Sequence, residues 1–184
     1  YKKELGEFKA PSEPASVPAI HTEPVYHLYH SRGPTTETKS FDVIINHPFF
    51  FGDWIVAHNG IISNFEKLAK EHFPNENLEG RTDSCIIPRM LDMFGIEGGP
   101  EKLQGTFAFW AYNIRTNNLH LVRNSCTLFA NWFTGDFSST EFKGSVELDE
   151  GILYTVNYSK NHYTRDARLK ASHRYSFKSP YFIF

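Results

Sequence analysis

The sequence predicts a single domain of the α+β class, and three observations support this prediction. Short apolar or β-branched runs bounded by turn residues occur towards both ends of the chain. Between them lie two stretches whose apolar residues recur at helical spacing. The chain has 184 residues, of which 40% are hydrophobic and 22% charged, a balance typical of a soluble globular protein with a sizeable core.

The first predicted strands lie before residue 58. The segment Phe8–Pro24 is rich in Pro, Ser, Ala and Glu, which predicts a surface connection without regular structure. Alternation over Val25–His30 and the apolar runs Phe41–Ile45 and Trp54–Ala57 predict three strands. The sequence His58-Asn59-Gly60 then predicts a turn, because Asn and Gly tolerate the positive φ that turns require.

A first helix is predicted directly after this turn. Asn64 is a suitable N-cap residue, and the predicted helix ends before Pro74. One face of it carries apolar side chains, namely Phe65, Leu68 and Ala69.

A second helix is predicted after Thr82 or Asp83, either of which can cap it. Gly95 provides its stop signal. Pro88 lies inside the pattern and predicts a kink or a break. The apolar positions at helical spacing are Ile86, Ile87, Met90, Leu91 and Phe94.

The C-terminal part of the chain is predicted to form strands joined by polar turns such as Thr116-Asn117-Asn118. The four predicted strands are Thr106–Ile114, Leu119–Val122, Phe129–Phe133 and Leu153–Asn157. We therefore predict one domain over residues 1–184, with a connecting segment at 1–24, a core at 25–157 and a tail at 158–184. The tail is mixed basic and aromatic, and the pattern assigns it no role.

Charge and cysteine content exclude several classes of protein. The formal net charge of −2 gives no reason to expect nucleic acid or an anionic membrane as partner. No run of apolar residues is long enough to span a bilayer. Cys85 and Cys126 form neither a disulfide framework nor a zinc pattern, which fits a reducing cytoplasmic setting. His47 and His58 likewise show no recognised ligand spacing, so we predict no metal site and no cofactor.

Several short motifs follow one another in a fixed order along the chain. They are His30-Ser31-Arg32-Gly33-Pro34-Thr35-Thr36, Asn46-His47-Pro48-Phe49, Ala57-His58-Asn59-Gly60-Ile61-Ile62-Ser63-Asn64, Thr82-Asp83-Ser84, Leu103-Gln104-Gly105-Thr106-Phe107-Ala108-Phe109 and Phe137-Ser138-Ser139. Each motif alone is weak, but their order and approximate spacing resemble class II glutamine amidotransferases over nearly the whole chain. The compact versions encoded by bacteriophages resemble it best.

The resemblance implies a fold and an activity. The family fold is a four-layer αββα sandwich of the N-terminal nucleophile hydrolase type. The family activity is the release of ammonia from L-glutamine for transfer to an acceptor. Such a site must hold the α-carboxylate and α-ammonium of glutamine and stabilise the oxyanion that forms at its side-chain amide. The acceptor is not indicated by any motif.

The resemblance also assigns roles to individual residues. Arg32 is expected to bind the α-carboxylate, because a guanidinium fork binds two oxygens. Asp83 is expected to bind the α-ammonium, and Asn59 and Gly60 to form the oxyanion hole. Thr35, Thr36 and His58 complete the predicted substrate pocket, although the family often has His at the position of Thr36.

Each of these residues also has a simpler reading. Arg32 alone would suit a surface ion pair, and Asp83 alone would suit a carboxylate at a helix N-terminus. An Asn-Gly pair is far more often a plain turn than an oxyanion hole. The motif context is what favours the functional reading.

The family uses a cysteine at its mature first position, whereas this sequence begins with Tyr1. We therefore expect the fold to be incomplete at its N-terminus and the 184 residues alone to be catalytically inactive, with a missing N-terminal segment or a protein partner completing the sheet. Cys85 falls in a predicted helix and Cys126 follows a strand, and neither is expected to replace the nucleophile.

Two other functions stay open at this point. The chain could be a non-catalytic relative that serves as a structural or interaction subunit, for example in a phage particle, in which case it would reside in the virion or the host cytoplasm. It could also be a different N-terminal nucleophile hydrolase acting on another amide. Glutamine binding separates these readings, because Arg32 and Asp83 together serve only an α-amino acid.

Overall fold

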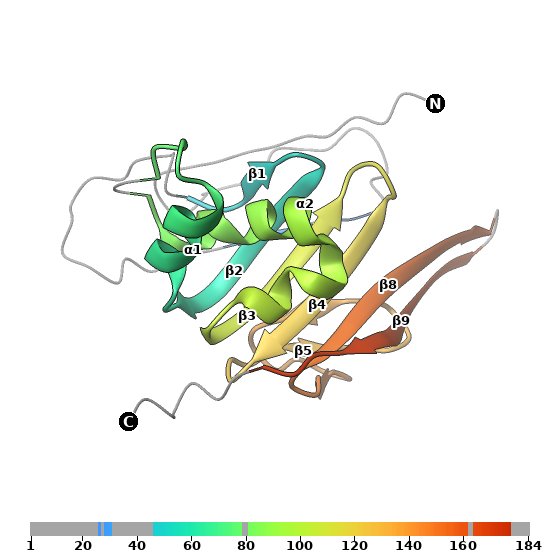
Figure 1. The fold of residues 1–184 in the computed structure, drawn as a ribbon. Coiled ribbons are helices and arrows are strands. Elements are labelled where there is room, and N and C mark those ends of the chain that lie inside the picture. The colour runs from blue at the N-terminus through green and yellow to red at the C-terminus, as the bar shows by residue number, and fades with distance from the viewer. Residues whose placement is uncertain (1–25, 27, 31–45, 79–80, 162–163, 178–184) are drawn as a thin grey trace. The chain divides into compact units, whose positions relative to one another are not determined.

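The structure is a computed structural model that describes residues 26, 28–30, 46–78, 81–161 and 164–177 (Figure 1). The chain divides into two compact units, residues 1–47 and residues 48–184. In the first unit the rings of His30 and His47 lie with their centroids 3.9 Å apart. The predicted strand Phe41–Ile45 lies outside the described residues, as do Val25 and His27. The other residues of Val25–His30 belong to no strand.

The second unit is built on a six-stranded antiparallel sheet with the order β1-β2-β3-β4-β8-β9. Its strands are β1 (Phe49–Phe51), β2 (Trp54–Ile62), β3 (Gly105–Asn113), β4 (Asn118–Asn124), β8 (Ile152–Asn161) and β9 (Thr164–Arg174). A second, three-stranded sheet has the order β6-β5-β7. Its strands are β5 (Phe129–Ala130), β6 (Phe137–Ser138) and β7 (Val146–Glu147).

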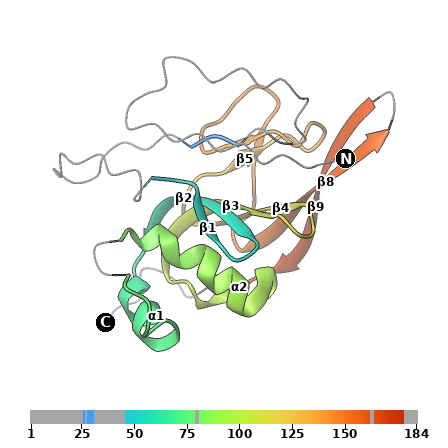
Figure 2. The same cartoon turned by 90° about the horizontal axis from the view of Figure 1, so that it is seen from above.

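Helices cover one face of the large sheet, and the small sheet lies on the other side of it (Figures 1 and 2). The helices are α1 (Phe65–His72) and α2 (Ile86–Gly98), with short 3-10 turns η2 (Asp83–Cys85) and η3 (Pro100–Lys102) beside them. Antiparallel sheets with few helices confirm the predicted α+β class. The described residues supply three successive layers of the predicted sandwich, namely helices, large sheet and small sheet.

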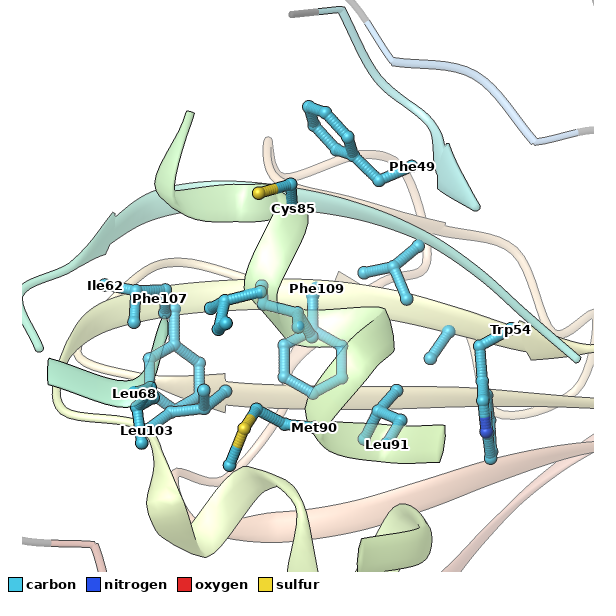
Figure 3. Close-up of a cluster of buried hydrophobic side chains, with 14 of the residues drawn as sticks. Phe49, Trp54, Ile62, Leu68, Cys85, Met90, Leu91, Leu103, Phe107 and Phe109 are labelled. Atoms are coloured by element: carbon cyan, nitrogen blue, oxygen red, sulfur yellow. The ribbon is translucent and has the colours of Figure 1, made fainter. Parts of the chain in front are cut away.

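The hydrophobic core lies between the large sheet and α2 (Figure 3). Phe107 and Phe109 of β3 point into it, and Met90 and Leu91 of α2 meet them with almost no exposed surface. Alternation along β3 sends every second side chain to this face, which explains why Phe107 and Phe109 are buried together there. Burial of such side chains stabilises the fold by roughly 1.5–3 kcal/mol each.

The predicted turn at His58-Asn59-Gly60 is wrong, because all three residues lie inside β2. Asn59 pairs with Ala108 and Gly60 with Phe107 in the ladder between β2 and β3. This long ladder overrides the local turn preference of Asn-Gly. The expected positive φ is nevertheless present at Gly60, where φ is +122°.

The predicted helices are present, but two details differ. Asn64 precedes α1 without a side-chain capping hydrogen bond. Its side chain instead accepts from Gln104 N and donates to Lys102 O. Pro88 causes no kink, because it is the third residue of α2, where the backbone N–H has no helical partner to lose. The break is at Gly95, which has φ 72° and ψ 175°.

The C-terminal strands also differ in length from the predicted ones. β5 stops at Ala130, because Asn131 forms a turn in which its side chain accepts from Phe133 N. β8 runs beyond Asn157 and pairs with β9 from Ile152↔Arg174 to Asn161↔Thr164, so the segment predicted as a tail contains most of a long hairpin.

Candidate functional site

Strand β2 carries the three predicted site residues His58, Asn59 and Gly60. His58 is buried, with 3% of the residue's surface exposed, whereas Asn59 and Gly60 are exposed. Successive side chains of a strand point to opposite faces, so Asn59 points away from the face that His58 and Ile62 occupy. The end of β2 therefore combines a buried anchor with an accessible amide side chain.

Gly60 occupies a position that only glycine fits. Its φ of +122° is rarely adopted by residues with a side chain, and a Cβ atom there would lie 2.1 Å from the carbonyl oxygen of Thr106. Backbone N–H groups alternate between the two edges of a strand. Ser63 N donates to Gln104 O beside β3, and Ile62 N donates towards η2. By the same alternation, Gly60 N–H points to the edge that faces η2.

Asp83 reaches this edge from the start of η2. Its Oδ2 accepts a hydrogen bond of 2.6 Å from the backbone N–H of Ile62. A bond between a carboxylate and a backbone N–H is charge-assisted and stronger than a neutral one. The residue predicted to bind the ammonium is thereby fixed two residues from Gly60, the residue predicted to bind the oxyanion.

Ser84 contacts one of the predicted site residues, a contact that sequence reasoning missed. Its Oγ lies 2.9 Å from Nδ1 of His58, in a hydrogen bond buried from solvent. The sequence contained a signal, because Ser84 follows Asp83 in one of the ordered motifs, but only the carboxylate was given a role. His58 was predicted to line the substrate pocket, and the contact with Ser84 is one of its interactions.

Two side-chain amides, of Asn64 before α1 and of Asn124 at the end of β4, also hold the chain around the beginning of β3. The Asn64 amide holds Lys102 and Gln104, and Asn124 Nδ2 donates to Gly105 O at 2.8 Å. The bond to Gly105 O is buried, where an unmade hydrogen bond costs roughly 1–3 kcal/mol. These bonds fix the beginning of β3. This part of β3 contains Thr106, whose carbonyl oxygen lies close to Gly60.

Arg32, Thr35 and Thr36 lie outside the described residues, so their assigned roles remain predictions. Within the described part of the chain, Asp83 is bonded to β2, the strand that also carries His58, Asn59 and Gly60 of the predicted set. The described part contains no group of three or more His, Cys, Asp or Glu side chains arranged to hold a metal ion. No helix within that part is long and apolar enough to cross a membrane.

Neither cysteine has the character of an activated nucleophile. Cys85 is fully buried in the hydrophobic core (Figure 3), and burial raises the pKa of its thiol although Arg89 opposes this. Burial also raises the pKa of the half-buried Cys126 thiol, against the opposing effect of its hydrogen bond with Thr106. A raised pKa removes the thiolate that nucleophilic attack requires.

Comparison with known proteins agrees with the motif order. The sequence model of a family described as glutamine amidotransferase domain matches residues 46–139. Glutamine–fructose-6-phosphate aminotransferase of Lactococcus lactis is 31% identical over 90 residues, which cover 44% of this chain and 15% of that enzyme. The Halobacterium salinarum enzyme of the same name is 24% identical over 123 residues, or 61% of this chain and 20% of that enzyme.

A solved structure from Silicibacter pomeroyi, described as a glutamine aminotransferase class-II domain protein, has 16% sequence identity. The aligned region covers 68% of this chain and 70% of the solved chain, with a TM-score of 0.39. The chain spans only a fifth or less of the curated relatives named above. Since the family's sequence model covers just over half of the 184 residues, including β2, η2 and the beginning of β3, the chain belongs to the glutamine amidotransferase domain family.

Proposed function

We propose that this domain binds L-glutamine and hydrolyses its side-chain amide in the manner of class II glutamine amidotransferases. The observation that carries the proposal is the Ile62–Asp83 hydrogen bond of 2.6 Å. It joins the carboxylate suited to an α-ammonium group to the strand whose Asn59 and Gly60 suit an oxyanion. Glutamine carries both of these groups, separated by its short side chain.

In the proposed reaction a cysteine thiolate attacks the Cδ atom of glutamine, and the C=O π electrons move to oxygen. The Asn59 amide and the Gly60 N–H then stabilise the negative charge by hydrogen bonds, a contribution of roughly 3–4 kcal/mol per donor in comparable enzymes. Collapse of this intermediate breaks the C–N bond and leaves a thioester, and the departing nitrogen takes up the proton that the thiol gave up, so that ammonia is released. Water hydrolyses the thioester to glutamate and regenerates the thiol.

Asp83 and Arg32 would hold the amino-acid end of glutamine during these steps. The Asp83 carboxylate matches the ammonium charge, and the Arg32 guanidinium matches the α-carboxylate. Binding the end that does not react orients the end that does. Thr35 and Thr36 are proposed to line the pocket between them.

Neither cysteine in the sequence is proposed as the nucleophile, because burial raises both thiol pKa values. Family resemblance assigns that role to an N-terminal cysteine. We further propose that a linked domain or a partner protein supplies the ammonia acceptor. Two free thiols support a reducing compartment such as the cytoplasm.

The test is product release by the full-length protein that contains these residues. With L-glutamine as substrate, we expect glutamate and ammonia in equal amounts. L-asparagine is the matched control, because its amide is one methylene nearer to the ammonium and would miss the oxyanion hole. Absence of both glutamine binding and glutamate release would contradict the proposal and favour a non-catalytic subunit.

A further inference from the structure

We propose that His58 and Ser84 form a positioning pair that holds the oxyanion hole at a set distance from Asp83. This inference rests on the proposed glutaminase function and adds two residues to its site. Neither residue is proposed to touch the reacting atoms. Their effect is on the placement of Asn59 and Gly60.

The argument starts from two hydrogen bonds that bracket the oxyanion residues. On one side, Nδ1 of His58 lies 2.9 Å from Ser84 Oγ. On the other side, Ile62 N donates to Asp83 Oδ2 at 2.6 Å. Asn59 and Gly60 lie between these two anchor points of β2, and the two anchoring residues are neighbours in η2.

The anchoring turn is itself firmly held. Ser84 and Cys85 are buried, and Cys85 N donates to Thr82 O. Arg89 of α2 donates to Cys85 O at 2.9 Å and forms an ion pair of 2.7 Å with Glu76. An element packed and bonded in this way moves little, so it can serve as a fixed reference for β2.

The bracketed segment needs such a reference because it is exposed. Ile61 exposes 65% of its surface, and Asn59 and Gly60 are exposed as well. Strand β3 pairs with one edge of this segment. Away from that edge, η2 contacts β2 through the two bracketing hydrogen bonds. Loss of the His58–Ser84 bond would leave Asn59 and Gly60 anchored to η2 at the Ile62 end alone.

The expected consequence is a change in turnover more than in binding. The ammonium ligand Asp83 would stay in place, so glutamine would still bind. The oxyanion donors would be displaced, and a misplacement of about 1 Å can cost on the order of a hundredfold in rate. Interactions formed only in the transition state affect kcat rather than KM.

The chain offers a matched control for this test. His120 of β4 and Thr155 of β8 form the same kind of contact, with Nδ1 2.9 Å from Oγ1. This pair belongs to the same sheet, and the ring of His120 contacts β2 at Trp54, with the ring centroids 6.0 Å apart, at the opposite end of the strand from Asn59 and Gly60. Removing its hydroxyl tests the structural effect of losing a histidine–hydroxyl bond without altering the proposed site.

We would measure kcat and KM for glutamate release, together with thermal stability, in the full-length protein. Ser84→Ala is expected to lower kcat by about tenfold or more while KM stays near the parent value. Ser84→Thr, which keeps the hydroxyl, is expected to recover most of the rate. Thr155→Val is expected to lower the melting temperature to a similar extent and leave kcat unchanged. If Ser84→Ala does not fold, His58→Asn breaks the same contact from β2, and the same loss of kcat is expected.

Two results would overturn the inference while the proposed function stands. The first is an active parent protein whose kcat is unchanged by Ser84→Ala. The second is a loss of kcat in Thr155→Val as large as the loss in Ser84→Ala. In the first case Ser84 does not position the site, and in the second the loss is a general stability effect. A parent protein that neither binds glutamine nor releases glutamate contradicts the proposed function itself, and the inference falls with it.

Discussion

Asp83 and Ile62 are joined by a hydrogen bond of 2.6 Å in which the backbone N–H of β2 donates to the carboxylate of η2. The bond closes one end of β2 against the turn that begins α2. It also places a carboxylate next to an exposed strand segment that contains a glycine with positive φ. The first two predictions concern Asp83 and this glycine, Gly60.

Replacing Asp83 by Asn is expected to weaken glutamine binding without unfolding the protein. The Asn oxygen can still accept from Ile62 N, but the charge that attracts an ammonium group is lost. A hydrogen bond to a charged group contributes roughly 1.5–3 kcal/mol, so the Kd should rise by about ten- to hundredfold. Calorimetric titration with L-glutamine measures this change. An unchanged Kd would show that Asp83 does not bind the ammonium.

Replacing Gly60 by Ala is expected to destabilise the domain on the order of 3 kcal/mol. The added Cβ would meet Thr106 O at 2.1 Å, in a backbone conformation that residues with a side chain avoid. Gly98→Ala is the control, because its Cβ would meet Phe94 at an ordinary 3.5 Å. Urea unfolding of both variants compares the costs. Equal stabilities would mean that β2 does not hold Gly60 in the strained conformation.

His120 is expected to make stability depend on pH between about 4 and 6.5. Burial lowers the pKa of the folded histidine from 6.5 to about 4, so in this range the unfolded chain binds a proton that the folded chain does not. Stability therefore rises with pH across the range, by on the order of 3 kcal/mol in total, and is lost as pH falls. His120→Asn should remove this part of the dependence. Unfolding curves at several pH values test it, and an unchanged slope in the variant would contradict the account.

The two cysteines are expected to differ in reactivity and to be dispensable for catalysis. Cys126 is half-buried and should react with a thiol reagent in the folded protein, whereas the fully buried Cys85 should react only after unfolding. Cys126→Ser should leave glutamate release unchanged. A complete loss of activity in that variant, with the fold intact, would identify Cys126 as the nucleophile instead.

Much of the fold could be predicted from local patterns. The helical spacing of Ile86, Met90 and Leu91 predicted α2, and their burial against β3 confirms it. Local preference failed where a long-range partner decides the conformation. Asn59 and Gly60 suit a turn in isolation, but pairing with Ala108 and Phe107, some fifty positions away, extends β2 through them.

The site was predictable only in part for the same reason. The order of the motifs identified Asn59, Gly60 and Asp83. The Asn59 side chain and the Gly60 backbone can donate to an oxyanion, and the Asp83 carboxylate can bind an ammonium group. The His58–Ser84 contact joins residues 26 positions apart and depends on how η2 packs against β2. Asn64 illustrates the limit as well, since its amide reaches across to Lys102 and Gln104 instead of capping its own helix.

The most direct test of the central claim is the kinetics of glutamate release in an Asn59→Ala variant of the full-length protein. The account predicts that kcat falls by about a hundred- to a thousandfold while KM for glutamine changes little, because Asn59 would act on the oxyanion and not on bound substrate. An active parent whose kcat is unaffected by this substitution would contradict the assignment of the oxyanion hole to β2.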